Sequence, residues 1–190
     1  TGTGAAGGQK RPERLPAGAR VVVKVGSSSL TRADGGLDLN RIDILAGLIA
    51  GMRRRGHDVV LVSSGAVASG LVPLGMSRRP DELSLLQAAA SVGQGRLAAR
   101  WETAMSAYGL VTAQVLLTAH DVAIRSHYRT VRATFDSLLS LGAVPIINEN
   151  DAVATSEFSL GDNDRLAALV AHLVTADVLV LLTDVDGLWT

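Results

Sequence analysis

Residues 20–29 have the sequence RVVVKVGSSS, a run of valines interrupted only by Lys24 and followed by glycine and serines. The run does not alternate between apolar and polar side chains, so we expect both of its faces to be buried. Strands that are apolar on both faces are typical of a parallel sheet that helices cover on each side. This stretch therefore predicts an α/β fold.

Similar apolar runs recur along the chain and alternate with segments of helical periodicity. The further runs, which we interpret as strands, cover 59–62, 111–117, 144–147 and 178–182. Apolar residues at helical spacing predict helices over 40–55, 81–108 (eased near Gly93 and Gly95), 126–141 and 162–174. Because strand–helix–strand units cross over with a right hand, this order predicts a three-layer α/β/α sandwich with a mainly parallel sheet.

The first 19 residues differ from the rest of the chain. They contain five glycines and two prolines without apolar periodicity, so we expect a disordered tail over 1–19 and a domain over 20–190. Gly2, Gly4 and Gly7 formally match a dinucleotide-binding fingerprint. Since the sequence predicts no strand before these glycines and no helix after them, we discard the hypothesis that the protein is a dehydrogenase.

The composition indicates a domain that binds small molecules. The 190 residues include 18 basic and 18 acidic side chains, and this balance argues against nucleic acid or a membrane surface as partner. The absence of cysteine excludes disulfides, a cysteine-ligated zinc and a thiol nucleophile. Because no apolar run reaches membrane-spanning length and no signal peptide is visible, we expect a cytoplasmic protein.

Ligands of open parallel sheets bind beyond the carboxyl ends of the strands, so the residues that follow each run are the candidates for function. Sixteen of the 18 basic residues are arginine, and Lys24 is the only lysine outside the tail. An ammonium group near the end of a valine strand needs an anion, and the small residues at 26–29 would let backbone amides approach one. The alternative is that Lys24 extends along the strand end toward a surface carboxylate.

The second run is followed by SSGAVASG at 63–70, in which hydroxyls such as that of Ser64 and helix N-terminal amides could bind a carboxylate or phosphate. The stretch matches neither a P-loop nor a nucleophile elbow, and it could be a tight turn that simply needs small residues.

Asparagines and acids gather after the fourth run, as NEND at 148–151 and GDND at 161–164. Such groups can bind an amino group, orient a lysine or hold magnesium, but they are also common in turns and caps, and Asp162 suits a helix N-cap. Between them, 153–158 could form a hairpin flap. The last run is followed by TDVDG at 183–187, which we interpret as a ligand-contacting loop. No histidine spacing builds a metal site, and we assign no metal ligand.

These segments together resemble the amino acid kinase family. The resemblance runs from residue 20 to 190 and rests on VVKVGSS (22–28), VSSGAVASG (62–70), AAASVGQ (88–94), QVLLT (114–118), INENDAVAT (147–155), GDND (161–164) and LLTDVDGL (181–188). The asparagine-rich segment followed by GDND indicates the members of the family that act on L-glutamate.

The resemblance implies ATP-dependent phosphorylation of the side-chain carboxylate of L-glutamate, the first step of proline biosynthesis, with Mg²⁺ bridging the ATP phosphates. It implies that Lys24 contacts the ATP phosphates and the transferring phosphoryl group, and that Asp164 orients this lysine. The remaining implied roles are binding of glutamate and of the nucleotide, by Ser64, Asp151 and Asn163 and by Thr183 and Asp184 respectively. It further implies a homo-oligomer that proline inhibits at a site overlapping that of glutamate.

The sequence departs from the family pattern at its C-terminal side. Members of the family continue with a glycine-rich nucleotide loop and a second catalytic lysine, and many add a PUA domain, so we expect 20–190 to be an incomplete kinase domain that is inactive alone. Two other hypotheses stay open. The chain could be a non-catalytic module that binds glutamate or proline, or belong to a kinase for acetylglutamate, aspartate or a nucleoside monophosphate.

Overall fold

A five-stranded parallel sheet forms the centre of the molecule. The structure is a computed structural model that describes residues 15–32, 36–153 and 163–182. The strands stand in the order β3-β4-β2-β1-β5, and every pairing between them is parallel. Their bounds are β1 Arg20–Val25, β2 Asp58–Ser63, β3 Thr112–Leu117, β4 Val144–Glu149 and β5 Val178–Leu182. All five lie where the apolar runs predicted them.

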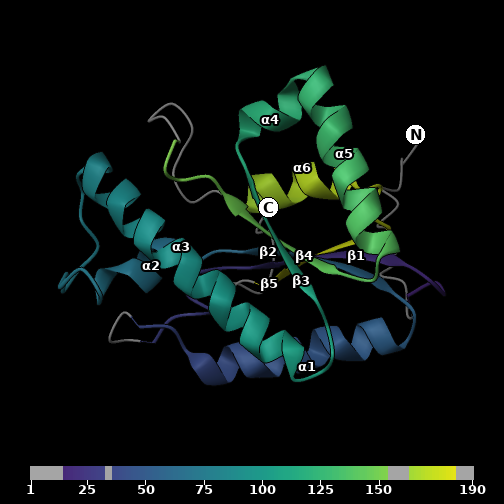
Figure 1. The fold of residues 1–190 in the computed structure, drawn as a ribbon, viewed down its shortest axis with the longest axis horizontal. Coiled ribbons are helices and arrows are strands. Elements are labelled where there is room, and N and C mark those ends of the chain that lie inside the picture. Colours follow the sequence, from purple (N-terminus) through teal and green to yellow (C-terminus); the bar gives the residue numbers. More distant parts are fainter. Residues whose placement is uncertain (1–14, 33–35, 154–162, 183–190) are drawn as a thin grey trace, which may run out of the picture.

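Helices cover both faces of this sheet. Helices α1 (Leu39–Arg54) and α3 (Leu83–Ser106) lie on one face, and α5 (Arg125–Ser140) and α6 (Asn163–Leu173) lie on the other (Figure 1). Two shorter helices, α2 (Ala66–Leu71) and α4 (Ala119–Ala123), follow the ends of β2 and β3. Val21 and Val23 of β1 belong to the core beneath α1 and α3, whereas Val22 belongs to the core beneath α5 and α6. The predicted three-layer α/β/α sandwich is confirmed.

The helix ends follow the capping chemistry of the sequence. Asp38 accepts a hydrogen bond from the backbone N–H of Arg41 at 3.1 Å and so caps α1. The helix ends on Arg53 and Arg54, and Gly56 then takes the left-handed conformation at φ 83°. The side chain of Thr118 accepts from the N–H of Asp121 while the Asp121 carboxylate accepts from the N–H of Thr118, which closes a capping box on α4.

Helix α3 runs without a break through Gly93, where the sequence predicted that the helix would be less regular. The glycine serves packing instead. A Cβ at Gly93 would lie 1.8 Å from the carbonyl oxygen of Ala66, and one at Gly70 would lie 1.9 Å from that of Ala89. Helices α2 and α3 therefore touch backbone to backbone, which only glycine at these two positions permits.

Residues 15–19, which precede the expected domain boundary at residue 20, contact the core of the domain. Leu15 packs against the core beneath α1, and Ala19 is buried within it. The backbone N–H of Asp58 also bonds to the carbonyl of Ala19 at 3.0 Å. The expected disordered tail over 1–19 is thus wrong for 15–19, and the rest of it lies outside the described residues.

No helix in the described part of the chain combines the length and the hydropathy that crossing a membrane requires.

Candidate active site

A pocket opens at the carboxyl edge of the sheet, beyond the ends of β2 and β4. It contains about 450 Å³ of empty space that is partly open to solvent. Its walls come from the turns after β1 and β2, from α2 and the segment between α2 and α3, from the end of β4 and the turn after it, and from the start of α6. The residues that line it are Ser27, Ser64, Gly65, Ala66, Val67, Ala68, Arg79, Asn148, Glu149, Asp151 and Asn163. This is the edge at which open parallel sheets bind ligands.

Gly65 turns the chain from β2 into α2. It has φ 107°, in the left-handed region that favours glycine, and Ser64 directly before it lines the pocket. The tight turn of small residues is therefore present, and Ser64, Gly65, Ala66, Val67 and Ala68 line the pocket.

Lys24 forms an ion pair beside the pocket. Its Nζ lies 2.8 Å from Oδ1 of Asp164 in the first turn of α6, and Lys24 is only 8% exposed. A Cβ at Gly26 would lie 3.4 Å from this Nζ, about van der Waals contact, so the ammonium group lies close to the turn after β1. This ion pair lies next to the pocket, because Asn163, the residue before Asp164, lines the pocket. The predicted orientation of the lysine by Asp164 agrees with this geometry, as does a lysine that reaches a carboxylate.

A chain of side-chain hydrogen bonds crosses the floor of the pocket. Asn163 Nδ2 donates to Ser64 Oγ at 2.7 Å and to Asn148 Oδ1 at 3.0 Å. Asn148 Nδ2 in turn donates to Gln94 Oε1 on α3 at 2.7 Å. Ser64, Asn148 and Asn163 are all buried, with at most 9% exposure.

The carboxamide oxygen of Asn163 is buried and has no hydrogen-bond partner among the described residues. A buried acceptor without a donor costs about 1–3 kcal/mol. Since Asn163 lines the pocket, an ammonium or hydroxyl group of a ligand would remove this penalty.

Asp151 carries a perturbed carboxyl group. Burial and the nearby charge of Glu149 raise the pKa of Asp151 to about 6, against a smaller lowering influence of Arg79. Glu149 and Asp151 thus give the pocket wall a negative potential. A bound cationic group would relieve this potential and lower the pKa of Asp151 toward its ordinary value.

The structure brings most of the predicted site residues together. Ser64, Asp151 and Asn163 line one pocket, and Lys24 and Asp164 pair beside it. Thr183, Asp184 and the candidate N-cap Asp162 lie outside the described residues, and so does most of the predicted flap at 153–158.

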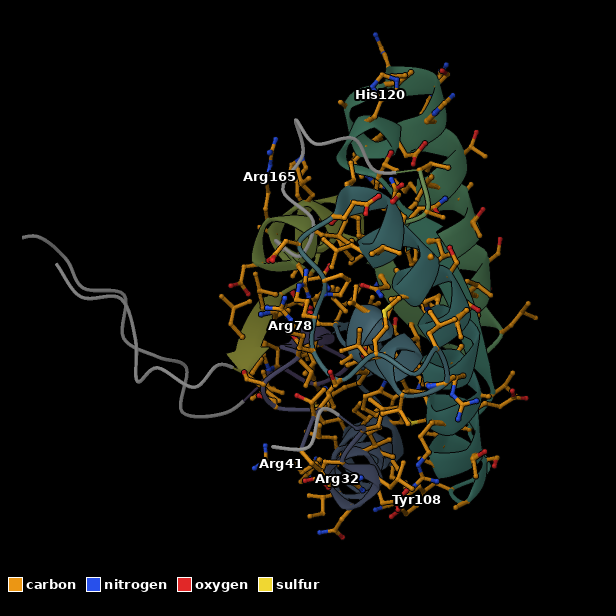
Figure 2. The ribbon with its side chains drawn as sticks, turned by 90° about the vertical axis from the view of Figure 1, so that its left-hand side faces the viewer. Arg32, Arg41, Arg78, Tyr108, His120 and Arg165 are labelled. Carbon is orange, nitrogen blue, oxygen red and sulfur yellow. The ribbon has the colours of Figure 1, made fainter. Side chains whose placement is uncertain are left out.

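Figure 2 shows the side chain of Arg165 on the outside of the molecule beside α6. Asn163 and Asp164 at the start of this helix instead reach Ser64 and Lys24. The inward and outward positions of α6 therefore follow the helical repeat, which places successive side chains about 100° apart.

Sequence reasoning assigned no role to Gln94 or Arg79. Gln94 belongs to the segment AAASVGQ at 88–94, where it is the polar residue at the end of a run of small ones. Arg79 follows α2 in a segment without periodicity, and only its place in the wall of the pocket identifies it.

The chain is similar in sequence to known proteins. The model of the amino acid kinase family matches residues 19–190. The chain is 61% identical over 170 residues to a glutamate 5-kinase of Streptomyces coelicolor, a match that covers 90% of this chain and 46% of that protein. It is 58% identical over 188 residues to a glutamate 5-kinase of Thermobifida fusca, which covers 99% of this chain and 48% of that protein. The chain thus spans about half the length of the curated relatives it matches.

The fold also occurs in a solved structure of low sequence similarity. A carbamate kinase of Giardia superposes with a TM-score of 0.61 at 19% identity, over 90% of this chain and 76% of that one. This likeness concerns the fold alone.

Proposed function

The chain belongs to the amino acid kinase family, and we propose that it provides the amino-acid-binding site of an enzyme that phosphorylates the side-chain carboxylate of L-glutamate with ATP. The similarity to glutamate 5-kinases at 58–61% identity supports this substrate. The observation that carries the proposal is the polarity of the pocket around Ser64, Asp151 and Asn163.

The pocket offers partners for both ends of an amino acid. The unpartnered oxygen of Asn163 and the carboxylate of Asp151 suit an α-ammonium group. Ser64 Oγ accepts from Asn163, so its own proton can be donated to a carboxylate oxygen of the ligand. Arg79 adds positive charge to the same wall. We propose that Ser64, Asp151 and Asn163 hold glutamate in this way.

We propose that Lys24 stabilises the transferring phosphoryl group. A side-chain carboxylate oxygen of glutamate attacks the γ-phosphorus, the bond from phosphorus to the leaving ADP oxygen breaks, and an acyl phosphate forms. Negative charge spreads over the phosphoryl oxygens during this step, and a fixed ammonium group lowers its energy. The pairing with Asp164 would hold Lys24 at the sheet edge while leaving donors for phosphate.

The described residues contain no cluster of three side chains suited to hold a metal ion. We propose that magnesium arrives with ATP, bound chiefly by its phosphates and water, and that it would neutralise phosphate charge. We propose that Thr183 and Asp184 contact the nucleotide. Proline shares the α-ammonium and α-carboxylate of glutamate, and we propose that it binds at an overlapping position.

The experiment that tests the proposal is trapping of the acyl phosphate with hydroxylamine, which converts it into a hydroxamate. The protein at its native length is incubated with ATP, magnesium and either L-glutamate, L-aspartate or N-acetyl-L-glutamate. We expect hydroxamate from L-glutamate, little from the shorter L-aspartate and none from the acetylated compound, which lacks the ammonium group. Preference for aspartate or N-acetylglutamate would assign the chain to a different kinase, and tight glutamate binding without hydroxamate would indicate a binding module.

A further inference from the structure

Gln94 of α3 contacts the pocket through the carboxamide of Asn148. We propose that Gln94 is a positioning residue that holds the Asn148 carboxamide in the orientation that the backbone selects and, through Asn148, also holds Asn163. The ligand concerned is the L-glutamate of the proposed function, on which this inference rests.

The backbone determines which end of the Asn148 carboxamide is the oxygen. The N–H of Glu149 donates to this side chain at 2.9 Å, and a backbone N–H cannot face an NH₂ group. The NH₂ group of Asn148 must therefore lie at the other end, which points to α3. Its partner there has to be an acceptor, and Gln94 presents Oε1 at 2.7 Å.

The orientation of the Asn148 carboxamide in turn determines that of the Asn163 carboxamide. Asn148 Oδ1 accepts from Asn163 Nδ2 at 3.0 Å, and this Nδ2 also reaches Ser64 Oγ at 2.7 Å. The contact with Asn148 Oδ1 requires the NH₂ group of Asn163, and Ser64 Oγ accepts from this same group, so the oxygen of Asn163 is left for the ligand. If Asn148 turned over, its NH₂ group would face that of Asn163, and Asn163 would have to expose its NH₂ group to an incoming ammonium group.

The close contact of α2 and α3 accounts for the reach of Gln94. Gly93, the preceding residue, lies against the backbone of Ala66, where even a methyl group would not fit. Helix α3 is thereby held close to the carboxyl edge of the sheet, and Gln94 can contact the buried Asn148 at the end of β4.

A purely structural tie between α3 and β4 is the competing explanation, and three variants separate the two. Gln94→Met keeps the length of the side chain but removes the acceptor. Gln94→Glu keeps acceptor oxygens and should rescue the contact. Gln114→Met makes the same change at an exposed glutamine of β3 and is the matched control.

The test measures two quantities on the same ¹⁵N-labelled chain. The first is solvent exchange of the Asn148 side-chain NH₂ protons, which are assigned by their loss in Asn148→Asp. The second is the dissociation constant of L-glutamate. For Gln94→Met we expect exchange to accelerate and the dissociation constant to rise about tenfold, the effect of one hydrogen bond. Gln94→Glu should keep slow exchange, and Gln114→Met should change neither quantity.

Unchanged exchange in Gln94→Met would overturn the proposed contact, and faster exchange with unchanged glutamate affinity would reduce Gln94 to a structural tie. Absence of glutamate binding by the unaltered chain would count against the proposed function instead, while exchange would still report on the orientation of Asn148. If Gln94→Met does not fold, Gln94→Ser, which leaves space for water, is measured in its place with the same expectations.

Discussion

Lys24 and Asp164 join the carboxyl end of β1 to the first turn of α6, with Nζ and Oδ1 2.8 Å apart. The two partners differ in exposure, because the side chain of Lys24 is 10% exposed and that of Asp164 is 52% exposed. A half-exposed ion pair contributes little to stability. The pair is therefore better explained by what it does for the position of a buried ammonium group than by its contribution to folding.

Replacing Lys24 by methionine should remove phosphoryl transfer while leaving the fold intact. The variant loses the positive charge on the phosphoryl group, and we expect hydroxamate formation to fall by about 10²–10³-fold or more. L-Glutamate binding should persist, because Lys24 does not line the glutamate pocket. Near-normal turnover by Lys24→Met would remove the catalytic role assigned to this residue.

Asp151 should make the ligand-free protein less stable as the pH rises. Its pKa of about 6 exceeds the value of an unfolded chain, so the folded state binds more protons between pH values of about 4 and 6. The loss of stability that ionised Asp151 causes is absent below this pH window and complete above it.

Asp151→Asn removes the charge and should raise the free energy of unfolding at pH 7 by about 1–2 kcal/mol, allowing for partial exposure of the carboxyl group. The gain should vanish near pH 4. Denaturant unfolding of both proteins between these pH values measures it. A variant less stable than the parent at pH 7 would show that another contact of Asp151 outweighs its burial.

Two glycines of α3 should respond in opposite ways to alanine. Gly93→Ala would push α2 away from α3, and we expect a loss of about 1–3 kcal/mol in stability and weaker glutamate binding. A Cβ at Gly95 would meet open space, with no atom of another element within 4 Å, so Gly95→Ala should stabilise the helix by about 0.5–1 kcal/mol. Thermal unfolding of the parent chain and of the two variants measures these changes in stability. Equal stability of the two variants would mean that α2 and α3 are not in backbone contact.

The arrangement of layers could be predicted from the sequence because the central strands β1, β2 and β4 contribute apolar side chains to the cores on both faces of the sheet. The limits of β2 differ slightly from the apolar run at 59–62, since Asp58 and Ser63 continue the pairing with β1 although their side chains are polar. Backbone hydrogen bonds define a strand, and side-chain hydropathy only approximates its ends.

The same reasoning located much of the candidate site but missed Gln94. Lys24 lies near the end of β1 and Ser64 follows β2. Because these two strands are parallel neighbours, the topology alone brings both residues to the carboxyl edge of the sheet. Gln94 lies 54 residues before Asn148 in the middle of a helix. Its contact depends on the depth at which α3 packs against α2, a tertiary property that no local pattern in the sequence contains.

Calorimetric titration of L-glutamate into the chain at neutral pH tests the central claim most directly. We expect one site, lost in Asn163→Ala and kept in Ala168→Ser, which alters the exposed face of the same helix. Loss of binding in Asn163→Ala alone would confirm that the pocket around Asn163 is the glutamate site. Absence of binding by the unaltered chain, or equal binding by both variants, would contradict the account.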